Sequence, residues 1–187
     1  MKKGTIVLLV ILALLVIGVM TFIGRYNKMQ QLKIDVDNGW AEVENQLNRR
    51  YDLIPNLVNT VRGYASHESD VLTQVTEMRS RVGSAQTTED RMAANNELSS
   101  SLSRLLMVVE NYPDLKADQS FIRLQDELAG TENRLATARR RYNDAVTALN
   151  RSIIIFPNNI IANMFAIMPA TFFEAPQEAR VVPQVEF

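Results

Sequence analysis

An uncharged apolar run near the N-terminus, residues 4–24, constrains the fold more than any other feature. It reads GTIVLLVILALLVIGVMTFIG, which is 21 residues without a charged side chain. As an α-helix it is roughly 32 Å long, enough to cross a bilayer hydrocarbon core of about 30 Å. We therefore predict a transmembrane anchor whose successive turns carry Gly4, Leu8, Leu12, Leu15, Val19 and Ile23.

A cleaved signal peptide is the alternative interpretation of this run. The apolar core of a signal peptide is about 7–15 residues long and ends at a small-x-small cleavage site, and neither property matches here. We expect an uncleaved single-pass anchor in a bacterial inner membrane. The flanking charges are nearly balanced, with Lys2 and Lys3 before the run and Arg25 and Lys28 after it. The two lysines favour a cytoplasmic N-terminus, which would place the rest of the chain on the periplasmic side.

Composition excludes several classes of function. The formal net charge of −1 lacks the basic excess typical of nucleic-acid binders, so no nucleic-acid partner is expected. With no cysteine, the chain has no disulfide, thiolate metal site or cysteine nucleophile. Its single histidine, His67, rules out a multi-histidine metal site. A hydrophobic fraction of 47% over 187 residues indicates a folded chain of about one domain.

Four amphipathic segments follow the anchor, each with apolar residues at steps of three and four, as in a helix that buries one face. No breaker separates the first segment from the anchor, so the two can form one continuous helix. We place a helix boundary at Tyr51–Asp52, with Asp52 as N-cap, because Pro55 is tolerated in a first turn but not in a helix interior. The predicted stripes are Leu32, Val36, Trp40, Val43, Leu47 and Tyr51; Leu57, Val61, Tyr64, Glu68, Leu72, Val75, Met78 and Val82; Asn95, Leu98, Leu102, Leu105, Val109 and Tyr112; and Phe121, Leu124, Leu128, Thr131, Leu135, Ala138, Tyr142, Ala145, Leu149 and Ile153.

The turns between these segments predict how the helices pack. The signals for helix ends and starts are Gly83, the capping sequence from Thr87 to Asp90, Pro113, and an N-cap at Asp118 or Ser120. The predicted fold is all-α: an N-terminal transmembrane helix followed by an antiparallel up-and-down bundle of four long helices. A long coiled coil between chains is the alternative, but short Pro- and Gly-containing connections favour the bundle. The predicted division is residues 1–25 as anchor, 26–156 as bundle and 157–187 as a short helix with a tail.

The stretch from Ser152 to Phe173 is uncharged but is not predicted to span the membrane. Its prolines and asparagines would leave unpaired polar groups in hydrocarbon. A short amphipathic helix fits better, and its apolar side comprises Ile160, Ile161, Met164, Phe165 and Met168. Two roles stay open: the helix caps the end of the bundle, or it contacts a membrane surface or another subunit. Residues 174–187 are expected to be extended.

Few residues suggest chemistry. His67 and Glu68 form the only His–acid pair, and no second group suggests a catalytic site, so no enzyme activity, metal or cofactor is expected. The cluster Arg49, Arg50 and Asp52 is interpreted either as fixing a turn or, with Asn56 and Asn59, as a docking surface at one tip of the bundle. The run Arg139–Arg141 is interpreted as a solvated face, with contact to anionic lipid or another subunit as the alternative.

Two long motifs carry a resemblance to a known family. The segment around RRYDLIPNLV, within residues 26–68, and the block NYPDLKA-x(4)-RLQDEL resemble the LemA family, as do Phe156-Pro157 and the closing VPQVEF. The resemblance covers nearly all of the chain after the anchor and implies a membrane-anchored bundle of long antiparallel helices. Relatives often have a more basic run where this chain has Ile154-Ile155 before Phe-Pro.

The resemblance also implies what kind of function to expect. No enzymatic activity is established for the family, and one relative looks to be involved in shaping an internal bacterial membrane. Some relatives carry a lipidated cysteine in place of the anchor, which would hold their bundle outside the cytoplasm, whereas others are described with the bundle inside. We expect a non-enzymatic scaffold or assembly protein that contacts the lipid bilayer and self-associates. The alternative is an accessory subunit of a membrane metalloprotease or a TPM-domain partner, suggested by neighbouring genes in the family.

Overall fold

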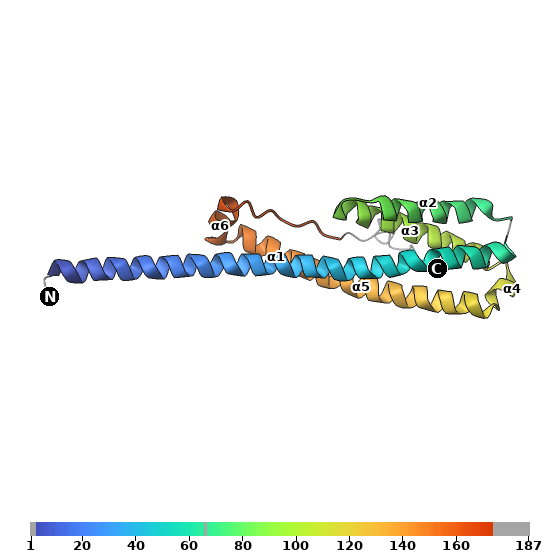
Figure 1. The fold of residues 1–187 in the computed structure, drawn as a ribbon, viewed down its shortest axis with the longest axis horizontal. Coiled ribbons are helices and arrows are strands. Elements are labelled where there is room, and N and C mark those ends of the chain that lie inside the picture. Colours follow the sequence, from blue (N-terminus) through green and yellow to red (C-terminus); the bar gives the residue numbers. More distant parts are fainter. Residues whose placement is uncertain (1–2, 66, 174–187) are drawn as a thin grey trace, which may run out of the picture. The chain divides into compact units, whose positions relative to one another are not determined.

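The computed structural model describes residues 3–65 and 67–173, and every regular element in them is a helix. The all-α class is therefore confirmed for the described residues, while the predicted extended tail at 174–187 lies outside them. The elements are α1 (Lys3–Tyr64), α2 (Ser69–Ser84), α3 (Thr88–Val109), α4 (Pro113–Lys116), α5 (Gln119–Ile154) and α6 (Asn158–Met164) (Figure 1).

The described residues fall into two compact units. The anchor unit contains residues 3–39 and 141–171, which are the first part of α1, the last part of α5, and α6. The core unit contains residues 40–140 and 172–173, which include the rest of α1, α2, α3, α4 and the first part of α5. Helix α1 therefore contributes residues to both units.

Helix α1 is one continuous helix that includes the anchor, which agrees with the sequence, since no helix-breaking residue follows the anchor. It does not end where predicted. The boundary at Tyr51–Asp52 is wrong: α1 runs on to Tyr64 with Pro55 in its interior, and Asp52 is an exposed mid-helix residue rather than an N-cap. A proline lacks the N–H that would bond the carbonyl four residues earlier, here that of Tyr51. In its place Arg79 of α2 donates a hydrogen bond from Nε to the Tyr51 carbonyl oxygen at 3.2 Å. Arg79 also stacks on the Tyr51 ring, with its guanidinium carbon 3.8 Å from the ring centroid.

Replacing Arg79 with Leu is expected to destabilise the protein, because the Tyr51 carbonyl then loses its donor at the proline. The expected loss is about 2–4 kcal/mol, the sum of a charge-assisted hydrogen bond and a cation–π contact. Arg81→Leu on the same helix is the matched control, since Arg81 pairs with Glu97 at an exposed site and should cost less than about 1 kcal/mol. Denaturant unfolding of the full-length protein in detergent, followed by circular dichroism, measures both. Equal losses for the two variants would contradict this account of Pro55.

The core unit is built on the apolar stripes. Its main cluster takes buried residues from α1, α2, α3, α4 and the start of α5, among them Leu57, Leu72, Leu98, Leu115 and Phe121. The predicted second helix begins later than expected, because residues 57–64 belong to α1 and α2 starts at Ser69. The third helix starts as predicted, since the side chain of Thr87 accepts the backbone N–H of Asp90.

The start of α5 also follows the prediction, with Asp118 as its cap. Asp118 Oδ1 accepts the backbone N–H groups of Ser120 and Phe121 at 2.8 and 2.9 Å. The Phe121 amide, and the Tyr64 hydroxyl that bonds Oδ2, lower the pKa of this carboxyl. Helix α5 then runs for 36 residues without a break at Gly130, which is the predicted length.

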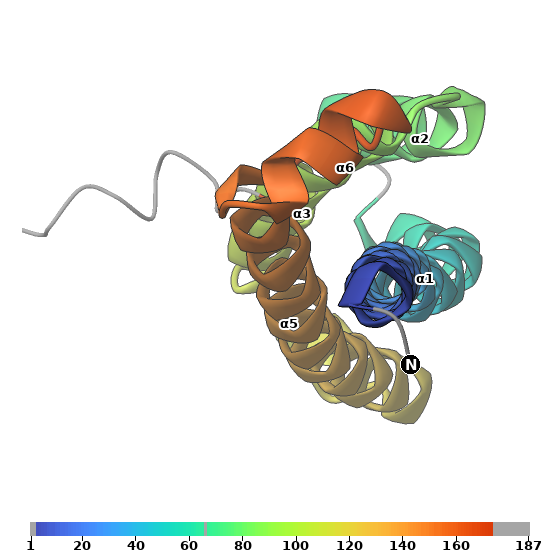
Figure 2. The same ribbon diagram turned by 90° about the vertical axis from the view of Figure 1, so that its left-hand side faces the viewer.

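In the anchor unit, α1 and α5 approach closely. A side chain at Gly39 would place its Cβ 3.1 Å from the Tyr142 Cα, a tight contact that favours a glycine here. After α5 the chain forms α6, which lies across the end of α5 (Figure 2). It then returns along α5, where Asn150 forms two hydrogen bonds with the backbone of Ala170, both 2.9 Å long. The Tyr142 hydroxyl donates to the Thr171 carbonyl at 2.8 Å.

Candidate functional site

The apolar start of α1 is exposed in the part of the chain that the structure describes. One helix of the described chain is long and apolar enough to cross a membrane, and none of its apolar window is buried. In Figure 1 the first turns of α1, drawn in dark blue, extend beyond α6, which belongs to the same unit. All six predicted anchor positions are exposed: Gly4, Leu8, Leu12, Leu15, Val19 and Ile23.

The predicted docking surface around Arg49 splits between two faces of α1. Arg49, Asp52, Asn56 and Asn59 are exposed and follow one another at steps of three and four, so they share an outward face. Arg49 pairs with Glu127 of α5 at 2.9 Å, which lowers the pKa of Glu127. Arg50 is only 7% exposed, so its assignment to a surface at a bundle tip is wrong. These residues lie within α1 rather than at a helix end, because the helix continues to Tyr64.

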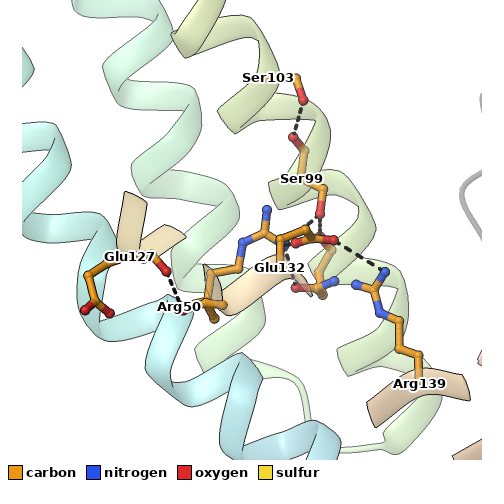
Figure 3. Close-up of polar contacts among 8 residues, drawn as sticks. Arg50, Ser99, Ser103, Glu127, Glu132 and Arg139 are labelled. Atoms are coloured by element: carbon orange, nitrogen blue, oxygen red, sulfur yellow. Dashed lines mark hydrogen bonds and ion pairs between the residues drawn. The ribbon is translucent and has the colours of Figure 1, made fainter. Parts of the chain in front are cut away.

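Arg50 forms the centre of a buried polar cluster between α1, α3 and α5 (Figure 3). Its Nη1 lies 2.9 Å from the Ser99 hydroxyl and 3.5 Å from Asn95 Oδ1. The same nitrogen also forms an ion pair with Glu132 Oε2 at 2.9 Å. The geometry of this pair is not that of a hydrogen bond, and Glu132 Oε2 accepts none. Burial lowers the pKa of Arg50, and the charge of Glu132 opposes this shift. The guanidinium stays charged at neutral pH, because arginine is not deprotonated in proteins.

Arg139 approaches the same glutamate from the next turns of α5. Its Nη1 lies 3.8 Å from Glu132 Oε1, and its guanidinium carbon lies 4.4 Å from the centroid of the Phe173 ring. Burial is the main cause that lowers the pKa of Arg139. The prediction of a solvated Arg139–Arg141 face is therefore wrong for Arg139, which Phe173 covers, while Arg140 and Arg141 are exposed.

A cleft of about 360 Å³ opens beside this cluster. Arg50, Ser99 and Glu132 supply polar groups, and the walls are mainly apolar, with Leu57, Leu102, Leu106 and Leu128. Clefts of this size with apolar walls and a few polar groups bind ligands or side chains. The cleft lining holds no histidine or cysteine that could act as a nucleophile or base.

Helix α6 buries one side and exposes the other. Ile161 and Ala162 are buried, while Ile160, Met164, Phe165 and Met168 are exposed, so four of the five predicted apolar residues are available for contact. The Phe165 ring packs on Tyr26 and Phe22 of α1, with centroid distances of 4.5 and 6.2 Å. The N-terminal residue of α6, Asn158, accepts a hydrogen bond from Arg25 at 3.0 Å.

The only histidine of the sequence, His67, does not line the cleft beside Arg50. His67 is exposed in the turn between α1 and α2, and Glu68 accepts a hydrogen bond from the Tyr112 hydroxyl at 3.0 Å. Within residues 3–65 and 67–173, no cluster of three or more acidic or histidine side chains could hold a metal ion.

Sequence reasoning missed the partners of Arg50, which are Ser99, Asn95 and Glu132. One signal was present: Val43, Leu47, Arg50, Ile54, Leu57 and Val61 repeat at steps of four and three, and all six are buried. Arg50 therefore occupies a position of the apolar stripe, which indicates an inward side chain. The misplaced boundary at Tyr51 hid this pattern.

Over the described residues, these features define an all-helical protein with one exposed helix of membrane-spanning length. Comparison with known proteins gives its family: residues 39–187 match the LemA family, so the chain belongs to it and the resemblance is confirmed. The chain is similar to Protein LemA of Metamycoplasma hominis, with 24% identity over 90% of this chain and 78% of the relative. It is also similar to magnetosome protein MamQ 2 of Paramagnetospirillum magneticum, with 25% identity over 87% and 72% of the two chains. Magnetosome protein MamQ of Magnetospirillum gryphiswaldense is 20% identical over 99% of this chain and 79% of its own length.

Proposed function

We propose that this protein is a non-enzymatic scaffold of a bacterial inner membrane, anchored by residues 4–24 and involved in organising the membrane. The observation that carries the proposal is the continuity of α1. One helix supplies a span whose apolar window is exposed among the described residues, and it also supplies Ile54, Leu57 and Val61 to a hydrophobic core. A bundle body of four antiparallel helices, including the second part of α1, fits the apolar stripes. The relatives named as magnetosome proteins support a membrane role.

Self-association is part of this proposal, because a scaffold has to connect several copies or partners. Sedimentation velocity of the full-length protein in detergent should show particles whose protein mass exceeds the monomer mass of 21.2 kDa. The measurement should cover protein concentrations around and above that in the cell membrane. A strict monomer at every concentration, with no co-purifying protein, would contradict the scaffold. The role of protease or TPM-domain accessory subunit stays an expectation from the family resemblance, since no contact described above favours it.

The proposal places the helical body on the periplasmic side. Ser84 is exposed at the end of α2, and the chain has no native cysteine, so Ser84→Cys provides one probe. A membrane-impermeant maleimide should label this variant in intact cells with a permeable outer membrane. The matched control is Lys2→Cys, before the span, which should be labelled only after lysis. The reverse pattern would place the body in the cytoplasm and overturn this part of the proposal.

A further inference from the structure

The end of α5 and the segment that contains α6 expose several large apolar side chains. They are between 45% and 75% exposed and comprise Ile154, Ile155, Phe156, Ile160, Met164, Phe165 and Met168, which we call the α6 surface. Large exposed apolar patches on a folded protein usually mark an interface. Neither the family match nor the relatives' names assign a role to this patch.

The position of the α6 surface on α1 indicates what covers it. Phe165 packs on Phe22 and Tyr26, and these two residues flank Gly24, where the uncharged run ends. At 1.5 Å per residue, Phe22 lies only about 3 Å inside that end of the span. The α6 surface therefore continues directly from the anchor, at the level where the hydrocarbon core gives way to lipid headgroups.

We propose that α6 lies in the headgroup region of the bilayer and inserts its exposed apolar side chains beside the anchor. An interfacial helix buries its apolar face about 5–10 Å into the boundary between headgroups and acyl chains. Arg25, Lys28 and Arg151 are exposed on the adjoining turns of α1 and α5 and are suited to contact lipid phosphates. This inference rests on the membrane anchor of the proposed function.

The C-terminal end of α6 suits such an environment, because its last backbone groups are paired within the protein. The N–H of Ile167 bonds the Ala162 carbonyl at 2.9 Å, and the N–H of Ala166 bonds the Asn163 carbonyl at 3.4 Å. Together they form a Schellman motif that satisfies the last carbonyls of the helix. At the other end, the contact between Arg25 and Asn158 ties α6 to α1. Less unpaired backbone then has to enter the poorly hydrated boundary.

The consequence for function is a membrane contact at two points. A single helix is free to rotate about its axis in the bilayer, whereas interfacial anchors fix its rotation and tilt. With α6 embedded beside Phe22, the side of α1 that carries α6 has to stay at the membrane surface. A scaffold attached in this way presents a fixed face to its neighbours.

Depth-dependent fluorescence quenching tests the proposal on the full-length protein. It is reconstituted in vesicles of phosphatidylcholine and phosphatidylglycerol that contain lipids brominated at shallow or deep acyl carbons. The single native tryptophan is removed by Trp40→Phe, and one tryptophan is introduced by Met164→Trp on α6. Met107→Trp on α3 is the matched control, because Met107 and Met164 are 65% and 64% exposed. Leu12→Trp at the centre of the span reports insertion of the anchor.

The expected result is graded quenching. The tryptophan at position 12 should be quenched most by deep bromines, the one at position 164 most by shallow bromines, and the one at position 107 by neither. If position 12 is quenched while position 164 behaves like position 107, the α6 proposal is overturned and the anchor stands. If position 12 is not quenched, the anchor and the proposed function fail together. A blue-shifted but unquenched signal at position 164 would mean that protein covers α6, which also overturns the proposal.

Discussion

Replacing Arg50 with Met is expected to lower the free energy of unfolding by about 2–4 kcal/mol, whereas Arg49→Met should cost less than about 1 kcal/mol. The two residues are neighbours of the same type, but they lie on different faces of α1. Arg49 is an exposed partner of exposed Glu127, and such pairs contribute little because water screens them. Arg50 is buried, and its removal leaves Glu132 and Asn95 without their cation. Removing one partner of a fully buried pair costs about 3–5 kcal/mol, and the expected loss is smaller because Glu132 is partly exposed.

A double-mutant cycle separates the ion pair from simple packing. If Arg50 acts through Glu132, the variant carrying both Arg50→Met and Glu132→Met should be less destabilised than the sum of the two single variants, by about 1 kcal/mol or more. Denaturant unfolding of the full-length protein in detergent measures each value. Equal losses at positions 49 and 50, or strict additivity in the cycle, would show that the buried cluster does not stabilise the core unit.

The cluster around Arg50 shows how far the sequence predicts such a site. Periodicity predicted the buried faces well: Leu98, Leu102 and Leu105 are buried in α3, and α5 has the predicted length. The same periodicity also includes Arg50, between Leu47 and Ile54. Its partners Ser99 and Glu132 were beyond prediction, because they come from α3 and α5, and no local pattern records which side chains face each other across helices.

At Pro55 a generally valid local rule led to a wrong prediction of the helix boundary. A proline in a helix interior leaves one carbonyl without a donor, and the sequence near Pro55 contains no remedy. The donor is Arg79, 28 residues from Tyr51 along the chain, and only the packing of α2 on α1 brings them together. Tertiary contacts of this kind override local preference, and single-sequence reasoning cannot locate them.

The short helix α6 was predicted with its apolar residues but without its place in the fold. Of the two roles left open, capping the bundle or contacting a membrane or subunit, the sequence favoured neither decisively. The contact between Phe165 and Phe22 joins residues at opposite ends of the chain, and it places α6 in the same unit as the anchor. That contact is the reason for proposing the membrane as its partner.

Placing two arginines in the span is expected to have the largest effect on where the protein resides. The run contains 14 residues of Leu, Ile, Val or Phe, each favouring insertion by about 0.3–0.6 kcal/mol, or roughly 4–8 kcal/mol together. Each arginine near the centre costs about 2.5–3.5 kcal/mol and also removes a leucine. Leu12→Arg together with Leu15→Arg should therefore bring the insertion free energy close to zero.

The carbonate-resistant membrane fraction of the protein measures this change in cells. The unmodified protein should be almost entirely resistant, and the double arginine variant should fall to about half or less. Leu12→Ala with Leu15→Ala is the matched control, because alanine shortens the side chains without adding charge and should keep the protein in the membrane. The intact mass of the membrane-bound protein gives an independent check, since an uncleaved anchor retains the full 21.2 kDa. A mature protein shortened by the length of the apolar run would show that the run is a cleaved signal peptide, and both the anchor and the membrane contact of α6 would then have to be abandoned.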